Sequence, residues 1–139
     1  MTTVRTTITN TRADLAGVAQ WVADFAAAQG IAPAVVADLN VALDEVLSNI
    51  AKYGYADDAV HSIRLRLTAS ETAIEAEVED DGVAFDPLSF PSPDLDVSPA
   101  ERRVGGLGIH FVRTLMNEVT YARAGERNRL VLVKHLARD

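Results

Sequence analysis

The chain has no cysteine among its 139 residues, so neither disulfide bonds nor thiolate metal sites are available to it. It also lacks any apolar run of about 20 residues, the length that a helix needs to cross a membrane. Its first ten residues contain no apolar stretch of the kind found in secretory signals. These absences argue against secreted disulfide scaffolds and membrane proteins, and we expect a cytoplasmic protein.

Runs of basic residues are also scarce. No run of lysine or arginine exceeds two residues, and the formal net charge is −7. A protein that binds nucleic acid needs a basic surface to neutralise phosphates, so we expect no direct nucleic-acid partner. A protein partner, or a nucleotide accompanied by magnesium, suits an acidic chain better. Because 48% of the residues are hydrophobic, we expect a single domain over residues 1–139 with its own core.

Hydrophobic periodicity predicts a strand and then two helices. The β-branched segment 3–9 is typical of a strand. Thr11, with Asp14 three residues later, is typical of a helix start, and that helix is expected to stop at Gly30. A second helix is expected over 33–53, because a proline occupies its first turn and a glycine follows it. Its helical spacing predicts the buried stripe Val36, Leu39, Leu43, Leu47 and Ile50.

The next segment predicts a hairpin with one buried face. Apolar and charged residues alternate over 63–67 and again over 74–78, with a turn expected near Ser70. We interpret the charges as the solvated face of the sheet. Cross-strand ion pairs are expected there, Arg64 with Glu77 and Arg66 with Glu75. A further helix is expected over 106–116, followed by strands at 119–122 and 128–135.

Residues 87–104 differ in composition from the rest of the chain. Four of the five prolines lie there, among acidic residues and serines. A loop of this length in a compact domain is usually functional or disordered. Because it separates two candidate nucleotide-contact motifs, we interpret it as a lid over a nucleotide; the alternative is an inert surface excursion.

Three polar residues share one face of the second predicted helix, roughly opposite its apolar stripe: Glu45, Asn49 and Lys52. The plain interpretation is a solvated surface. Val41 and Ala42 lie on the same side, however, and asparagine gains nothing from an exposed position inside a helix. A carboxamide oxygen is a suitable Mg²⁺ ligand, and a glutamate one turn away can take a proton or orient a nucleophile.

Two glycine-containing segments are further candidate contacts for a nucleotide. Asp80-Asp81-Gly82 ends the second strand of the hairpin, where a carboxylate beside a turn can accept from an adenine amine; the alternative is a plain turn. Gly105-Gly106-Leu107-Gly108 opens the next helix, whose N-terminal amides and dipole favour phosphate; the alternative is a flexible hinge. The second segment is neither a Walker A motif nor a dinucleotide fingerprint.

These segments together resemble a known ATPase superfamily. Residues 43–55 look like the N-box shared by gyrase, histidine kinases and DNA mismatch-repair ATPases, and Asp80-Asp81-Gly82 and 105–108 resemble its two glycine boxes. The short chain, and residues 105–119 especially, are similar to bacterial anti-sigma factor serine/threonine-protein kinases. The resemblance implies a Bergerat-type ATP-binding fold, an α/β (α+β) two-layer sandwich with a mixed β-sheet and helices on one face.

The resemblance also implies roles for individual residues. Glu45 would be the general base toward the hydroxyl of a protein substrate, and Asn49 would bind the Mg²⁺ that bridges the phosphates of ATP. Asp80 would accept from the adenine amine, and Gly82 would let the base approach. The other residues expected at the nucleotide are Lys52, Ala84, Gly105, Gly106, Leu107 and Gly108. Ala84 replaces a glycine of the wider superfamily, and Val131 stands in a strand where a hydroxyl residue is often found near the nucleotide.

The function implied by the resemblance is that of a serine/threonine-protein kinase and anti-sigma regulatory factor. Such a protein uses Mg-ATP to phosphorylate an anti-anti-sigma protein, sequesters a sigma factor and forms a homodimer. The alternative is a nucleotide-responsive binding module of a partner-switching circuit without kinase activity. The three histidines show no metal-ligand spacing, and we expect them to be structural.

Overall fold

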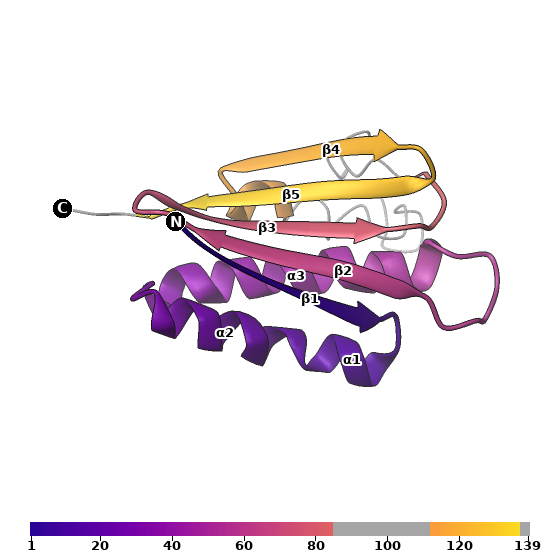
Figure 1. Ribbon diagram of the computed structural model, residues 1–139, viewed down its shortest axis with the longest axis horizontal. Coiled ribbons are helices and arrows are strands. Elements are labelled where there is room, and N and C mark those ends of the chain that lie inside the picture. The colour runs from indigo at the N-terminus through magenta and orange to yellow at the C-terminus, as the bar shows by residue number, and fades with distance from the viewer. Residues whose placement is uncertain (85–111, 137–139) are drawn as a thin grey trace, which may run out of the picture.

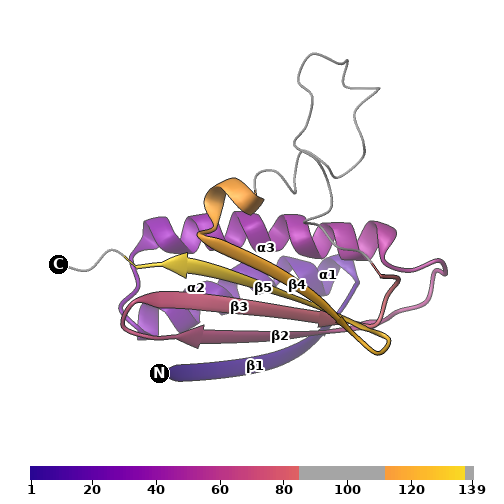
Figure 2. The ribbon, with the colours of Figure 1, turned by 90° about the horizontal axis from the view of Figure 1, so that it is seen from above.

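The computed structural model describes residues 1–84 and 112–136. Three helices lie together on one face of a five-stranded sheet, which makes two layers (Figures 1 and 2). This confirms the predicted two-layer sandwich. The elements are, in chain order, β1 (Thr2–Thr9), α1 (Arg12–Ala16), α2 (Val18–Ala28), α3 (Pro33–Tyr53), β2 (Ser62–Ala69), β3 (Ala73–Asp80), β4 (Glu118–Ala124) and β5 (Arg127–His135). None of these helices is long and apolar enough to cross a membrane.

The sheet has the strand order β1-β2-β3-β5-β4, and each pairing between the described strands is antiparallel. The expectation of a mixed sheet is therefore wrong in this detail. Between β1 and β2 the chain runs along the sheet in α1 and α2 and returns in α3. It therefore begins β2 at the same end of the sheet where β1 finishes. At that end the backbone N–H of Asn10 donates to the carbonyl of His61 at 3.0 Å. The other sequential neighbours, β2 with β3 and β4 with β5, are hairpins.

The first predicted helix is interrupted at Gly17, which separates α1 from α2. Glycine is a poor helix former, costing about 1 kcal/mol relative to alanine. The predicted cap is present, since the Thr11 hydroxyl accepts from the N–H of Asp14 at 3.3 Å. The Asp14 carboxylate reaches further back, to the N–H and the hydroxyl of Thr9 at 2.8 and 2.7 Å. These bonds lower the pKa of Asp14, that from the hydroxyl most, and tie α1 to the end of β1.

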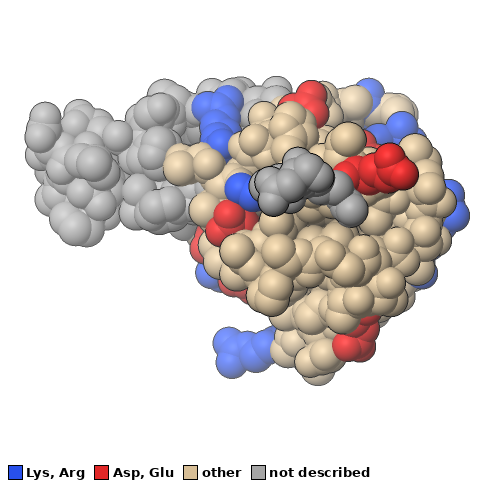
Figure 3. All heavy atoms as spheres, turned by 90° about the vertical axis from the view of Figure 1, so that its left-hand side faces the viewer, with Lys and Arg blue, Asp and Glu red and all other residues tan. Residues whose placement is uncertain are grey.

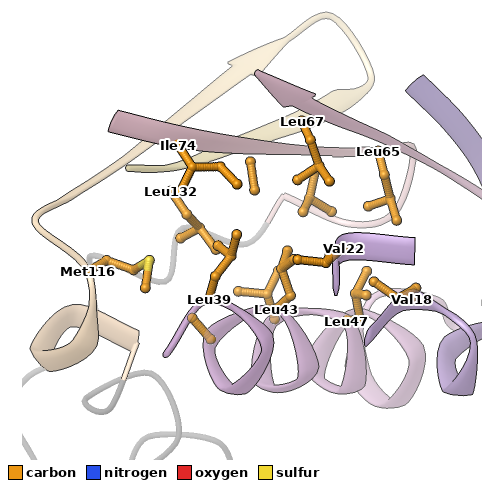
Figure 4. Packing of buried hydrophobic residues seen from close by; sticks show 14 of the residues in the cluster. Val18, Val22, Leu39, Leu43, Leu47, Leu65, Leu67, Ile74, Met116 and Leu132 are labelled. Carbon is orange, nitrogen blue, oxygen red and sulfur yellow. The ribbon is translucent and has the colours of Figure 1, made fainter. Parts of the chain in front are cut away.

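The core lies between the sheet and α3, with α2 closing one side (Figure 4). The centre of the predicted α3 stripe is confirmed, because Leu39, Leu43 and Leu47 are all buried. Val36 and Ile50, at its ends, are only partly buried. On the sheet side the core includes Ile63, Leu65, Leu67, Ile74, Val78 and Leu132, and from α2 it includes Val22 and Phe25.

The other face of the sheet carries a network of ion pairs. Arg64 pairs with Glu79 at 3.5 Å and Arg66 with Glu77, so the β2–β3 register differs by two residues from the predicted one. The predicted register would have left a two-residue turn. In the structure residues 70–72 join the two strands, and the Ser70 hydroxyl accepts from the N–H groups of residues 72 and 73, at 3.3 and 3.2 Å.

Glu77 shows that this face is not simply solvated. Its side chain is buried between Arg66 and Arg129, and the Arg129 Nε lies 2.7 Å from its carboxylate.

The end of the molecule that carries the β2–β3 turn is mostly uncharged, with charged side chains toward its margins (Figure 3). The net negative charge of the chain is therefore not concentrated at that end.

Candidate functional site

The end of α3 is joined to the turn that follows β3. The backbone N–H of Val83 donates to the carbonyl of Gly54, the residue after α3, at 2.8 Å. A β carbon on Gly82 would collide with the same Gly54 carbonyl and would lie 3.0 Å from the Asp80 Oδ1. Glycine is required here by this close approach. The structure thus brings the predicted polar helix and the Asp-Asp-Gly turn together at one end of the molecule.

Asp80 is the buried carboxylate of this turn, with 5% of its surface exposed. Its Oδ1 accepts from the N–H of Gly82 at 2.8 Å and from the Asn128 side-chain amide at 3.0 Å. No donor from the described part of the chain reaches its Oδ2. The Oδ2 is therefore available to accept from a ligand such as an adenine amine.

Asn128, which the sequence analysis missed, is the polar residue of β5 beside this turn. It is directly opposite Asp80 in the β3–β5 register and only 5% exposed. The family resemblance implies a hydroxyl residue near the nucleotide in this strand, and Val131 was singled out as its replacement. In the structure Val131 lies opposite Glu77 and Thr120. A register counted from the β4–β5 turn places Asn128 opposite Arg123, but no sequence signal places it beside Asp80, because β3 and β5 are not consecutive strands.

Asn49 is buried on the predicted polar face of α3, with 7% of its surface exposed. Its side-chain nitrogen donates to the carbonyl of Glu45 at 2.7 Å, which leaves the carboxamide oxygen as the atom available to a cation. That donor chemistry fits Mg²⁺, which takes few protein ligands and otherwise binds phosphate and water. Within the described residues no cluster of three histidine or carboxylate side chains could hold a metal by itself. Glu45, one turn before Asn49, is half-buried.

The remaining predicted site residues are less closely associated. Lys52 is exposed and lines a groove between α1 and α3 together with Arg12, Asp44 and Ser48. Ala84 is exposed just beyond the Asp-Asp-Gly turn. Gly105, Gly106, Leu107 and Gly108, and the predicted lid over 87–104, lie outside the described residues.

The loop after α3 is held against the turn by side chains. The Tyr55 hydroxyl donates to the Asp81 carboxylate at 3.0 Å, and its ring stacks on His61 with 3.8 Å between centroids. His61 in turn lies 2.7 Å from Asp57. Burial, followed by the bond to Asp81, raises the pKa of Tyr55, so its hydroxyl remains a donor at neutral pH. The acidic turn is therefore supported from the α3 side as well as from β5.

Comparison with known families and structures bears on the chemistry of this site. The family model described as "Histidine kinase-like ATPase domain" matches residues 8–134. The solved structure of the RsbU and RsbW domains of Rv1364c from Mycobacterium tuberculosis superposes with a TM-score of 0.70 at 18% identity. The superposition covers 100% of this chain and 34% of that one, and it supports the fold.

Two relatives are named as protein kinases. The serine/threonine-protein kinase BtrW of Bordetella bronchiseptica is 30% identical over 99 residues, which cover 71% of this chain and 70% of BtrW. The serine-protein kinase RsbW of Bacillus subtilis is 30% identical over 91 residues, which cover 60% of this chain and 55% of RsbW. The chain therefore belongs to the histidine kinase-like ATPase domain family, where its relatives include serine kinases of the BtrW and RsbW type.

Proposed function

We propose that this chain binds Mg-ATP and transfers its terminal phosphoryl group to a serine or threonine of an anti-anti-sigma protein. The observation that carries the proposal is the state of Asp80, a buried carboxylate with one oxygen bonded by the fold and the other without a donor among the described residues. Asn49 also supports the proposal. Its carboxamide is buried, and because its nitrogen donates to the carbonyl of Glu45, its oxygen is left for a cation. Membership of an ATPase family and the relatives' kinase names support the same class of ligand.

The base would be recognised at the turn after β3. The Asp80 Oδ2 would accept from the adenine amine, while the missing side chain of Gly82 lets the turn pack against the Gly54 carbonyl. Guanine presents a carbonyl at the equivalent position of the ring. A carboxylate oxygen repels a carbonyl oxygen, so the arrangement favours ATP over GTP.

The phosphates would lie toward the Asn49 face of α3. Bound magnesium would neutralise charge on the phosphates, with the Asn49 carboxamide oxygen as its protein ligand. Glu45, one helical turn away, would take the proton of the incoming hydroxyl. In phosphoryl transfer the protein contributes mostly positioning and charge stabilisation, so two side chains on one rigid helix are a suitable arrangement.

The partners follow from the same family relationship. We propose that the chain also sequesters a sigma factor and works as a homodimer. The formal charge of −7 favours protein partners over nucleic acid. The competing function is a nucleotide-responsive binding module that holds a partner without transferring phosphate.

The proposal is tested by two measurements on the wild-type protein. Calorimetry should show binding of ATP that depends on magnesium. Incubation with γ-labelled ATP and candidate antagonist proteins should label a serine or threonine of one of them. A folded protein that binds no nucleotide would refute the proposal, whereas tight ATP binding and partner capture without any labelling would favour the binding module.

A further inference from the structure

The β4–β5 hairpin reaches back to the turn after β3 through two side chains. Asn128 is opposite Asp80 in the β3–β5 register and opposite Arg123 in the β4–β5 register. It therefore stands between the acidic turn and the edge strand of the sheet. Arg123 comes from that edge strand, so three neighbouring strands meet at this side chain.

The Asn128 carboxamide uses both of its polar atoms. Its Nδ2 donates to the Asp80 Oδ1 at 3.0 Å and to the carbonyl of Val83 at 2.8 Å. Its Oδ1 accepts from the Arg123 Nη1 at 3.1 Å and from the Tyr121 hydroxyl. Because donors hold the oxygen, the nitrogen is forced toward Asp80, and the carboxamide cannot flip without breaking several bonds.

Arg123 adds a direct contact to the same turn. Its Nη1 donates to the carbonyl of Gly82 at 2.8 Å, while its Nε donates to the carbonyl of Gly125 at 3.2 Å. The hairpin thus binds the Asp80 carboxylate and the two carbonyls that follow it, those of Gly82 and Val83. A turn that is bonded at residues 80, 82 and 83 has one orientation, and the direction of the Asp80 Oδ2 is set with it.

We propose that Arg123 and Asn128 are positioning residues for base recognition, and that the preference of this chain for adenine depends on the β4–β5 hairpin. The inference rests on the proposed nucleotide site. Asn128 holds the Asp80 Oδ1, so the carboxylate presents its Oδ2 at one angle to the amine of the base. Without that donor the carboxylate rotates more freely, and its Oδ2 no longer lies at the angle that distinguishes an amine from a carbonyl.

A purely structural role for the network predicts something else. If Arg123 and Asn128 only stabilise the sheet edge, their loss lowers the free energy of unfolding and weakens ATP and GTP equally. The positioning role predicts a change in the ratio of the two dissociation constants. That ratio is insensitive to the fraction of folded protein, so it separates the two roles.

The experiment measures dissociation constants for Mg-ATP and Mg-GTP by calorimetry, at a temperature where thermal melts show each variant folded. Asn128→Leu keeps the approximate size of the side chain but removes the nitrogen that donates to Asp80, without adding a second charge beside it. Arg123→Ala removes the second contact from a more exposed position, so it also serves if Asn128 variants do not fold. The matched control is Arg127→Ala in the same hairpin, because Arg127 pairs with Glu79 at 3.4 Å and makes no hydrogen bond or ion pair with the described residues of the turn, 80–84.

We expect Asn128→Leu to weaken Mg-ATP by roughly 10- to 100-fold and Mg-GTP by less than about 3-fold, in keeping with loss of a charge-assisted hydrogen bond. Arg123→Ala should shift the ratio in the same direction by about 3- to 10-fold, and Arg127→Ala should leave it unchanged. Equal weakening of both nucleotides, or an unchanged ratio in the two variants, overturns the inference. A wild type that binds both nucleotides equally well overturns it too and leaves ATP binding intact, whereas a wild type that binds neither removes the proposed function itself.

Discussion

Gly54 and Val83 are joined by one backbone hydrogen bond of 2.8 Å, although 28 residues separate them in the chain. The bond connects the end of the α3 helix to the turn that carries Asp80. This bond links two parts of the proposed site. The α3 helix carries the proposed base and metal ligand, and the turn carries the proposed adenine contact. The spacing between the two halves of the site therefore depends on a backbone contact.

Gly82→Ala tests that contact. A β carbon at this position collides with the Gly54 carbonyl, so the turn must shift away from α3. We expect a loss of about 1–3 kcal/mol in the free energy of unfolding, measured by urea denaturation, and weaker ATP binding. The control is Gly17→Ala, where the nearest atom is the Asp14 carbonyl oxygen at 3.6 Å, an ordinary contact. That variant should be neutral or slightly stabilising, and equal losses in both would contradict the close approach.

Asp80→Asn tests the proposed adenine contact. Asparagine keeps the size of the side chain and an oxygen for Gly82, but it removes the charge that faces the amine. We expect Mg-ATP binding to weaken by about 1.5–3 kcal/mol in calorimetry. Asp81→Asn is the matched control, because Asp81 is exposed and bonds Tyr55. If the Asp81 variant lost as much affinity as the Asp80 variant, the adenine contact would have been assigned to the wrong carboxylate.

Glu45→Gln tests the proposed general base. The substitution preserves the helix and the shape of the side chain but cannot accept the proton of the incoming hydroxyl. Phosphate transfer should fall by roughly 10²- to 10⁴-fold while Mg-ATP still binds. Asp44→Asn, the neighbouring carboxylate in the groove between α1 and α3, should transfer phosphate at the wild-type rate. Undiminished transfer by the Glu45 variant would show that another group takes the proton.

Asp14 predicts one part of the acid sensitivity of the fold. Its pKa is lowered from the ordinary 3.8 by the hydroxyl and N–H of Thr9. A carboxylate whose folded pKa is depressed stabilises the protein above its unfolded pKa, and this contribution is lost as the pH falls through the lower, folded value. Asp14→Asn should therefore reduce stability at pH 7 and flatten the loss of stability below about pH 4 in urea titrations.

The control for Asp14 is an aspartate on the exposed loop after α3. Asp58→Asn removes one carboxylate and changes the net charge equally. It should leave the acid limb of the stability profile unaltered. Parallel profiles for the Asp14 variant and the wild type would mean that the bonds from Thr9 do not persist in solution.

The sequence by itself determined the local elements and the chemical class of the protein. Leucines at helical spacing over 39–47 predicted the buried face of α3, and alternation over 63–67 predicted the inner face of β2; both are confirmed. Such patterns can be read from the sequence because the residues on one face of a helix or strand recur at a fixed spacing along the chain. The family resemblance was also readable, since residues 43–55 and 80–82 carry their motifs in contiguous stretches.

Only the tertiary structure decided the relations between distant segments. The β2–β3 register pairs Arg64 with Glu79, and local alternation could not indicate it because a shift of two residues leaves the same side chains on each face. Asn128 was not predicted because its role depends on its position opposite Asp80 on the neighbouring strand β3. No motif near residue 128 in the sequence indicates that pairing. The need for glycine at residue 82 likewise comes from the carbonyl of Gly54. Periodicity reports which face of an element is buried, whereas register and close approach are set when elements pack against each other.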